Sequence, residues 1–228
     1  MPNTSPFSTS DLIAKIRDYQ SQNQELKRNS HHFVFDCPFG LAPNSKPKYI
    51  WMGLNPGDDT NDWSVTENKN SEETRDYDFQ REIVRSSGSA RRMTKLRSFL
   101  GDEVFNLTTH TQLFFWCSKN IKEDFYHRYQ TSFQLSPHIA FCCDLNRALI
   151  DRIEPRAIFL ESRKNIKIFK NYFKLDFVKS YPILNSPVDT YMLEDKFKLI
   201  NFDHLSALGN SIKARPEVSS LVRGLLAV

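Results

Sequence analysis

The chain has 228 residues, of which 39% are hydrophobic and 25% are charged, and its formal net charge is +4. A chain of this length and composition can bury one sizeable core, so we expect a single domain over residues 1–228. No stretch reaches the roughly 18 apolar residues of a membrane span, and the first residues lack a signal-peptide pattern, so we expect a cytoplasmic protein without membrane contact.

The four cysteines, at positions 37, 117, 142 and 143, are irregularly spaced and include no C-x-x-C pair. This pattern favours reduced thiols over a zinc or iron–sulfur site. We therefore expect no metal site.

Helical and strand-like segments alternate in the first half of the chain. Residues 8–28 open with N-cap residues and carry an approximate apolar stripe, which predicts a helix within an N-terminal extension over 1–45. "KYIWMG", residues 48–53, predicts the first clear strand, and the polar residues 58–78 after it predict a functional loop or a disordered segment. A helix is expected over 90–100, followed by a strand around residues 102–110.

The second half of the chain continues the alternation. A helix over 137–154 ends at Pro155, and the apolar strand "RAIFLES" follows it directly. The remaining expected elements are a helix over 163–173, a strand over 196–202 that enters a polar loop, and a C-terminal helix with Pro216 near its start.

This alternation predicts a three-layer α/β/α sandwich with a mostly parallel, four-stranded central sheet. Ligands of such sheets bind at the carboxyl ends of the strands. The loops after four strands should therefore meet in one cleft, to which they bring Asn55, Asn106, Glu161 or Ser162, and His204.

One segment, residues 81–97, carries six basic residues against a single glutamate. Two interpretations stay open: the segment binds phosphates, or it is the solvated face of a helix.

Three motifs, taken in order, resemble those of the uracil-DNA glycosylase superfamily. "GLNPG", residues 53–57, is similar to the first motif in its G-x-N-P-G form, as in the single-strand-selective and mismatch-specific branches. "VFNLTTHTQLFF", residues 104–115, resembles the strand whose terminal asparagine recognises the base, and "HLSAL", residues 204–208, resembles the second motif. The resemblance covers residues 48–214 and implies a uracil-DNA glycosylase-like fold.

The resemblance implies a monofunctional, metal-free hydrolase that removes uracil or a related deaminated base from DNA and needs no cofactor. Asn55 would orient the attacking water, Asn106 would recognise the base, and His204 would donate to the leaving base anion, for which a neutral imidazole suffices. The base would be flipped into a pocket that also includes Gly53, Leu54, Pro56, Gly57 and Trp63. Ser206 would hold a flanking phosphate, and the other expected DNA contacts are Arg91, Arg92, Lys95, Leu205 and Leu208.

The expected partner is single- or double-stranded DNA, and the expected state is a monomer, associated with the nucleoid if the source is bacterial.

The sequence also departs from the superfamily. Polar residues, "TENKNS", stand where relatives place a base-stacking aromatic; Trp63, Tyr77 and Phe79 are the available substitutes, and Trp63 is preferred because it lies in the loop nearest Asn55. In addition, Leu205 replaces a proline, and Glu161 would repel phosphate unless Arg163 or Lys164 neutralises it.

Three hypotheses therefore stand side by side. The first is the glycosylase, and the second is a non-catalytic module of the same fold that binds nucleic acid or a nucleobase, as in a regulatory or defence system. The third is an unrelated α/β enzyme acting on a small nucleotide or sugar, in which Asn55 merely caps a turn.

Overall fold

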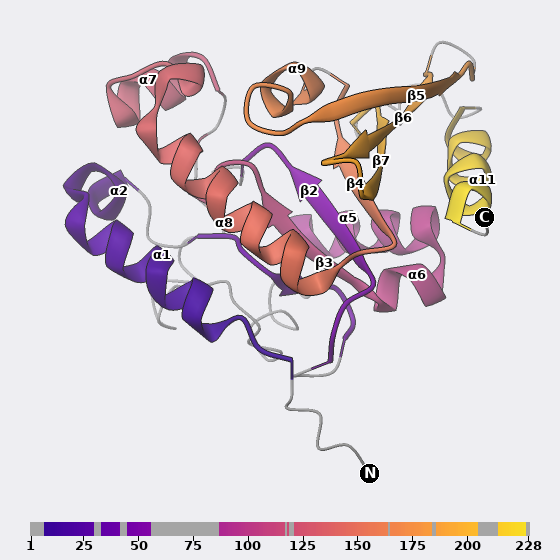
Figure 1. Cartoon of the computed structure of the whole chain (residues 1–228), viewed down its shortest axis with the longest axis horizontal. Helices are drawn as coiled ribbons and strands as arrows, with labels where there is room; N and C mark the ends of the chain where they lie inside the picture. The colour runs from indigo at the N-terminus through magenta and orange to yellow at the C-terminus, as the bar shows by residue number, and fades with distance from the viewer. Residues whose placement is uncertain are drawn as a thin grey trace.

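A mixed β-sheet with helices on both faces forms the centre of the molecule (Figure 1). The computed structural model describes residues 7–29, 33–41, 45–55, 87–116, 118, 121–163, 165–183, 186–204 and 214–226. The strands in these ranges are β1 (Cys37–Pro38), β2 (Tyr49–Gly53), β3 (Thr108–Gln112), β4 (Ala157–Glu161), β5 (Leu175–Tyr181), β6 (Val188–Leu193) and β7 (Phe197–Phe202).

The seven described strands are arranged in the order β1-β3-β2-β4-β7-β6-β5. Strands β3, β2, β4 and β7 run parallel to one another, whereas β1, β6 and β5 are antiparallel to their neighbours. The prediction of a four-stranded, mostly parallel sheet is therefore wrong, because the sheet is larger and mixed. The additional hairpin of β5 and β6 gives little sequence signal, since β5 is exposed on both faces and β6 buries the polar residues Asp189 and Thr190.

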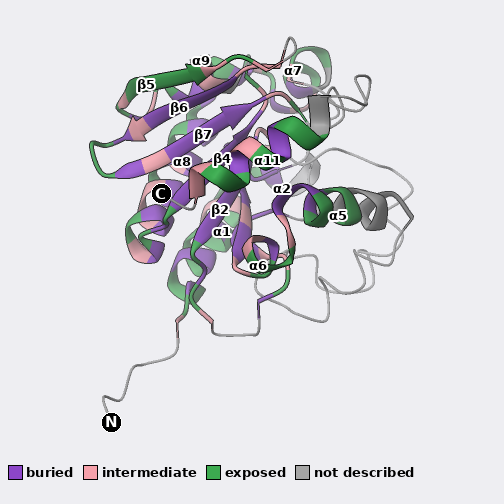
Figure 2. Ribbon diagram, turned by 90° about the vertical axis from the view of Figure 1, so that its right-hand side faces the viewer, coloured by how far each residue is buried: buried purple, intermediate pink, exposed green. Residues whose placement is uncertain are grey.

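The outermost described strand, β5, is exposed along most of its length (Figure 2). Phe177 and Val178 are among its exposed residues. Its pairing with β6 is irregular between Phe177 and Lys179, where the register shifts.

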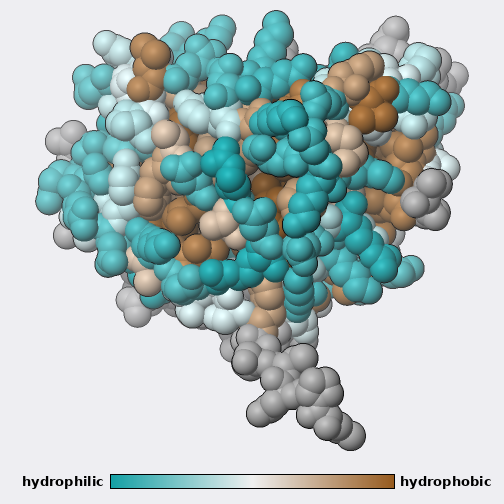
Figure 3. All heavy atoms as spheres, in the orientation of Figure 1, coloured by the Kyte–Doolittle hydropathy of each residue, from teal (hydrophilic) through white to brown (hydrophobic). Residues whose placement is uncertain are grey.

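The helices form a layer on each face of the sheet, because two separate apolar clusters include side chains from different helices. The first layer comprises α1 (Ser10–Gln22), α2 (Gln24–Asn29), α7 (Glu123–Tyr129), α8 (Pro137–Ile153) and α9 (Asn165–Phe169), with the short 3₁₀ helix η1 (Phe133–Leu135). The second comprises α5 (Ser87–Leu100), α6 (Asp102–Asn106) and α11 (Ala214–Leu226). The face that carries α1 and α8 is largely hydrophilic outside, with apolar patches between the polar side chains (Figure 3).

Strand β2 shows why both faces are covered. Ile50 and Met52 lie in the cluster with α8, whereas Tyr49 and Trp51 lie in the cluster with α5. Side chains alternate between the faces of a strand, so a continuous apolar run requires an apolar layer on each side. The predicted strand over 48–53 is confirmed.

The segment over 102–107 is not the strand that its apolar residues predicted. It forms α6, which starts after Gly101 at φ 81° and has Asp102 and Glu103 in its first turn, where acidic residues are favourable. Strand β3 begins only at Thr108 and has the sequence "TTHTQ", whose polar residues gave no strand signal. These residues are buried because they have partners: Thr109 donates to Asp36, and Thr111 donates to Asn146.

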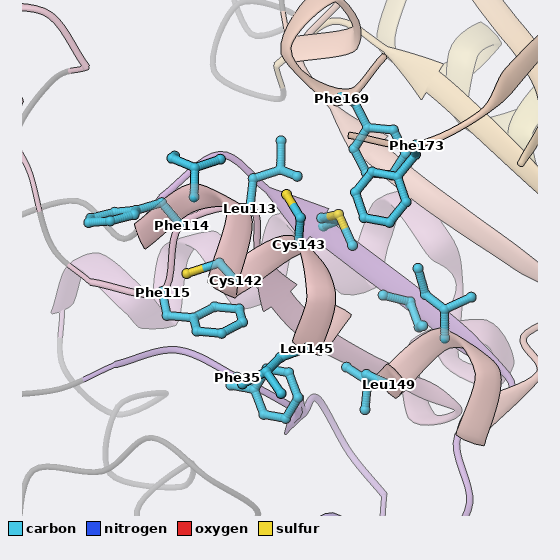
Figure 4. Packing of buried hydrophobic residues seen from close by; sticks show 14 of the residues in the cluster. Phe35, Leu113, Phe114, Phe115, Cys142, Cys143, Leu145, Leu149, Phe169 and Phe173 are labelled. Carbon is cyan, nitrogen blue, oxygen red and sulfur yellow. The ribbon is translucent and has the colours of Figure 1, made fainter. Parts of the chain in front are cut away.

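The cysteines at 142 and 143 lie within the first apolar cluster, on the side of α8 that faces the sheet (Figure 4). Burial raises the pKa of Cys143 to about 12 and raises that of Cys142 well above its ordinary value. Cys37 is also buried, and none of these three cysteines forms a disulfide within the described residues. They are therefore packing residues, and Cys117 lies outside the described residues.

The N-terminal helices are attached to α8 through a buried histidine. Nε2 of His138 lies 3.0 Å from Oε1 of Glu25, and Nδ1 lies 3.0 Å from the hydroxyl of Tyr19. Burial lowers the pKa of His138 below its ordinary value of 6.5, and the nearby Glu25 carboxylate offsets only part of this effect. At pH values above this lowered pKa the ring of His138 is neutral, its Nε2 donates to Glu25 and its Nδ1 accepts from Tyr19.

This histidine should make the protein less stable in mild acid. With its pKa lowered by folding, the unfolded chain binds a proton first as the pH falls, so stability decreases from about pH 6.5 down to the folded-state pKa. We expect the loss of unfolding free energy between pH 7 and pH 5, measured by urea denaturation, to be smaller in His138→Gln than in the wild type. An equal or larger loss in the variant would show that other groups cause the acid sensitivity.

None of the helices in the described ranges has both the length and the apolar composition needed to cross a bilayer.

Candidate functional site

The carboxyl ends of the four parallel strands lie along one edge of the sheet. The last residues of β3 and β2, Gln112 and Gly53, are paired in register, and those of β4 and β7, Glu161 and Phe202, are likewise paired. Because neighbouring strands are about 4.8 Å apart, the chain leaves β2 and β7 at points about 10 Å apart. Asn55 and His204, each two residues beyond its strand, follow these two points.

Polar side chains at this edge share the sheet face that α5 covers. Trp51 lies on this face, since its ring packs edge-on against Phe99 of α5 at 6.2 Å. Alternation places Gly53 on the same face, and the register with β3 places His110 beside Trp51 and Gln112 beside Gly53. The edge therefore combines groups from separate parts of the chain.

Phe202 extends this face across β7, because its ring lies 5.2 Å from that of Phe99. Glu161 is paired with Phe202 and is oriented to the same side, where it meets Trp51. We call the polar groups at or just beyond the ends of these four strands the polar row: Gln112 on β3, Asn55 after β2, Glu161 on β4 and His204 after β7.

At one end of the polar row, the side-chain amide of Gln112 makes a hydrogen bond through its nitrogen but, within the described part of the chain, not through its oxygen. Its side chain is only 3% exposed, its Nε2 lies 3.0 Å from Nε2 of His110, and its Oε1 has no hydrogen-bond partner among the described residues. A buried carbonyl without a donor costs about 1–3 kcal/mol. The amide lies against Gly53, where any Cβ atom would overlap Oε1, so this approach requires glycine.

In the middle of the row, Asn55 is oriented by the segment after β3. Its Nδ2 donates to the carbonyl oxygen of Ser118 at 2.8 Å and to the Oγ of Ser118 at 2.9 Å. These two bonds fix the amide nitrogen toward the β3 side, so the amide oxygen is directed away from Ser118. Asn55 is therefore held by tertiary contacts, whatever its role in the turn.

At the other end of the row, a buried carboxylate joins three strands. Glu161 is 2% exposed, and its Oε2 accepts a hydrogen bond from the indole nitrogen of Trp51 at 3.2 Å. Its Oε1 lies 3.3 Å from Nε2 of His204, whose side chain is 46% exposed. Arg163, one of the two basic residues that could neutralise Glu161, contacts Asp189 at 3.4 Å instead. Lys164, the other, lies outside the described residues.

Asn106 does not join this edge. It is the last residue of α6, and Leu107 after it accepts hydrogen bonds from Lys48 and Tyr49, at the start of β2. Asn106 therefore lies at the amino ends of β2 and β3, about 16 Å of strand away from the carboxyl edge. The structure does not bring Asn106 to this edge, because the strand begins later in the chain than its apolar residues indicated.

The remaining predicted residues are described only in part. Gly53 is buried and Leu54 is partly buried directly after β2. Lys95 is exposed on α5, and Arg91 and Arg92 belong to the same helix, although their side chains lie outside the description. Also outside the described residues are Pro56, Gly57, Trp63, Leu205, Ser206 and Leu208.

Three residues of the edge were not singled out by the motifs: Gln112, Ser118 and Trp51. Of these three, only Gln112 could have been identified from the sequence, because it is the last polar residue before the apolar run that follows β3. Ser118 and Trp51 act through contacts 63 and 110 residues away along the chain, which no local pattern reveals.

Across the described residues, no group of three or more histidine, cysteine, aspartate or glutamate side chains is placed to hold a metal ion. Comparison with known proteins adds no family: no family model matches the chain, and no curated protein matches it.

Proposed function

We propose that the protein hydrolyses the N-glycosidic bond between a base and its sugar in DNA, with uracil or a related deaminated base as the leaving group. The observation that carries the proposal is the polar row at the carboxyl edge, where Gln112, Asn55 and His204 come from three different strand ends on one sheet. This is the edge at which parallel α/β sheets bind ligands.

Each of these groups suits one requirement of base release. The amide of Gln112 can take the role expected of Asn106 once it turns outward from its buried position against Gly53, because its carbonyl has no hydrogen-bond partner among the described residues. Asn55, oriented by Ser118, can place a water molecule at the sugar carbon through its amide oxygen. His204 is the ionisable group at the same edge of the sheet, and Lys95 on α5 can contribute to phosphate binding.

The central prediction is release of free base by the wild type and its loss in two variants. End-labelled oligonucleotides carrying uracil, hypoxanthine or xanthine, single- and double-stranded, are incubated with the wild type, Asn55→Ala and His204→Ala. We expect each variant to lower the rate by about 10²–10³-fold, the range found when a single transition-state contact is removed. Asn171→Ala, an exposed asparagine after α9, is the matched control and should keep full activity.

A second candidate is a non-catalytic module of the same fold that binds nucleic acid or a nucleobase. The polar sequence "TENKNS", at the position where a stacking aromatic is expected, favours it. No base release from any oligonucleotide, together with DNA binding by the wild type, would establish this module in place of the glycosylase.

A further inference from the structure

The buried carboxylate of Glu161 is held from two sides. Trp51 donates to Oε2 from the centre of β2, and this indole is itself fully buried among the rings of Phe99, Phe159 and Phe202. His204 approaches Oε1 from the end of β7. The carboxylate therefore has a fixed position between a rigid donor and an imidazole that extends to the surface.

This contact determines which nitrogen of His204 carries the proton. An ionised carboxylate can only accept hydrogen bonds, so Nε2 must be the protonated nitrogen that faces Glu161. A neutral imidazole has one ring proton, and Nδ1 then carries a lone pair. In this state Nδ1 cannot donate to a leaving base, which contradicts the role expected for a neutral His204.

We infer that Glu161 is a positioning residue that holds His204 in the Nε2–H tautomer, and that Nδ1 accepts the proton of the attacking water. This inference rests on the proposed function and gives His204 a different role within it. In the step, the water oxygen bonds to the sugar carbon, the carbon–nitrogen bond breaks with its electron pair leaving on the base, and the water proton passes to Nδ1.

The same carboxylate stabilises the product of this proton transfer. Once Nδ1 is protonated, the ring is a cation 3.3 Å from the buried carboxylate of Glu161, and their attraction favours this state although solvent screens the half-exposed imidazole. Asn55 cannot accept a proton from water in this way, because its amide is not basic. The two residues thus divide the work: Asn55 orients the water, and His204 takes its proton.

The tautomer can be measured directly and without any substrate. Nitrogen-15 NMR of the imidazole, with His204→Gln to assign the signals, should show Nε2–H for His204 in the wild type near neutral pH. In Glu161→Gln the side-chain amide can donate to Nε2, so the ring should shift toward Nδ1–H. Trp51→Phe is the matched control, since it removes the other contact of the carboxylate but keeps the acceptor, and its ring should remain Nε2–H.

Base release supplies the second readout. We expect Glu161→Gln to lower kcat by about 10²-fold with KM nearly unchanged, at the low end of the range for general base catalysis. The inference is overturned if the wild-type ring of His204 is Nδ1–H, or if kcat is unchanged in Glu161→Gln. Base release by the wild type would still support the proposed function in either case. If the predicted tautomers are observed but no base is released, Glu161 does position His204, but the proposed base release is wrong.

Discussion

Replacing Trp51 with alanine should destabilise the protein by about 3–5 kcal/mol, the usual cost of removing a large buried aromatic side chain. Its ring lies in the centre of the second apolar cluster and contacts Phe99 of α5 together with Phe159 and Phe202 of the neighbouring strands. The substitution also removes the indole donor of the buried Glu161 carboxylate. Urea unfolding at neutral pH, followed by far-ultraviolet circular dichroism, measures the change.

Trp51→Phe separates packing from hydrogen bonding. It keeps an aromatic ring in the cluster but leaves Oε2 of Glu161 without its indole donor, which should cost about 1–3 kcal/mol. Adding Glu161→Gln to Trp51→Phe should restore part of this loss, because a neutral amide is cheaper to bury than an ionised carboxylate. A double variant that loses the full sum of the two single effects would show that Glu161 and Trp51 do not interact energetically.

Gly53→Ala should destabilise the protein by about 1–3 kcal/mol and lower base release by up to about 10²-fold. A Cβ atom at this position would overlap the amide of Gln112, which is buried and is held by His110. The buried amide must therefore shift from its present place at the carboxyl edge. Unfolding midpoints and base-release rates of the same preparation measure both effects.

Two other glycines provide matched controls. At Gly40 an added Cβ would overlap the amide of Asn106, but that side chain is exposed and can move aside at little cost. At Gly224 on α11 no atom lies within 4 Å of the added Cβ, and alanine should stabilise the helix by about 0.5–1 kcal/mol. If Gly40→Ala impairs base release as strongly as Gly53→Ala, the crowding at Gln112 is not the cause.

The elements that could be predicted from the sequence are those whose buried residues are apolar. Strands β2 and β4 are continuous apolar runs because helices cover both faces, and α8 combines an apolar stripe with Pro137 in its first turn. Strand β3 could not be predicted because its buried residues are threonines and a glutamine. Their partners, Asp36 and Asn146, lie 73 and 35 residues away along the chain.

The residues of the candidate site also divide into those that the sequence could place and those that it could not. Asn55 and His204 could be placed because each follows an apolar strand by two residues, and the parallel register takes both to one edge. Asn106 was misplaced because the boundary between α6 and β3 depends on Gly101 and on burial of polar side chains. The contact of Glu161 with Trp51 could not be predicted, since only the completed sheet brings β4 beside β2.

The irregular outer strand β5 bears on how the protein behaves at high concentration. A long, flat, apolar edge invites the strand of another molecule and is a common start of aggregation. In β5 the register shift between Phe177 and Lys179 interrupts that flat ladder, and the exposed lysine adds a charge that a pairing strand would have to desolvate. The two exposed apolar residues on this strand are thus accompanied by features that keep separate molecules apart during purification and crowding.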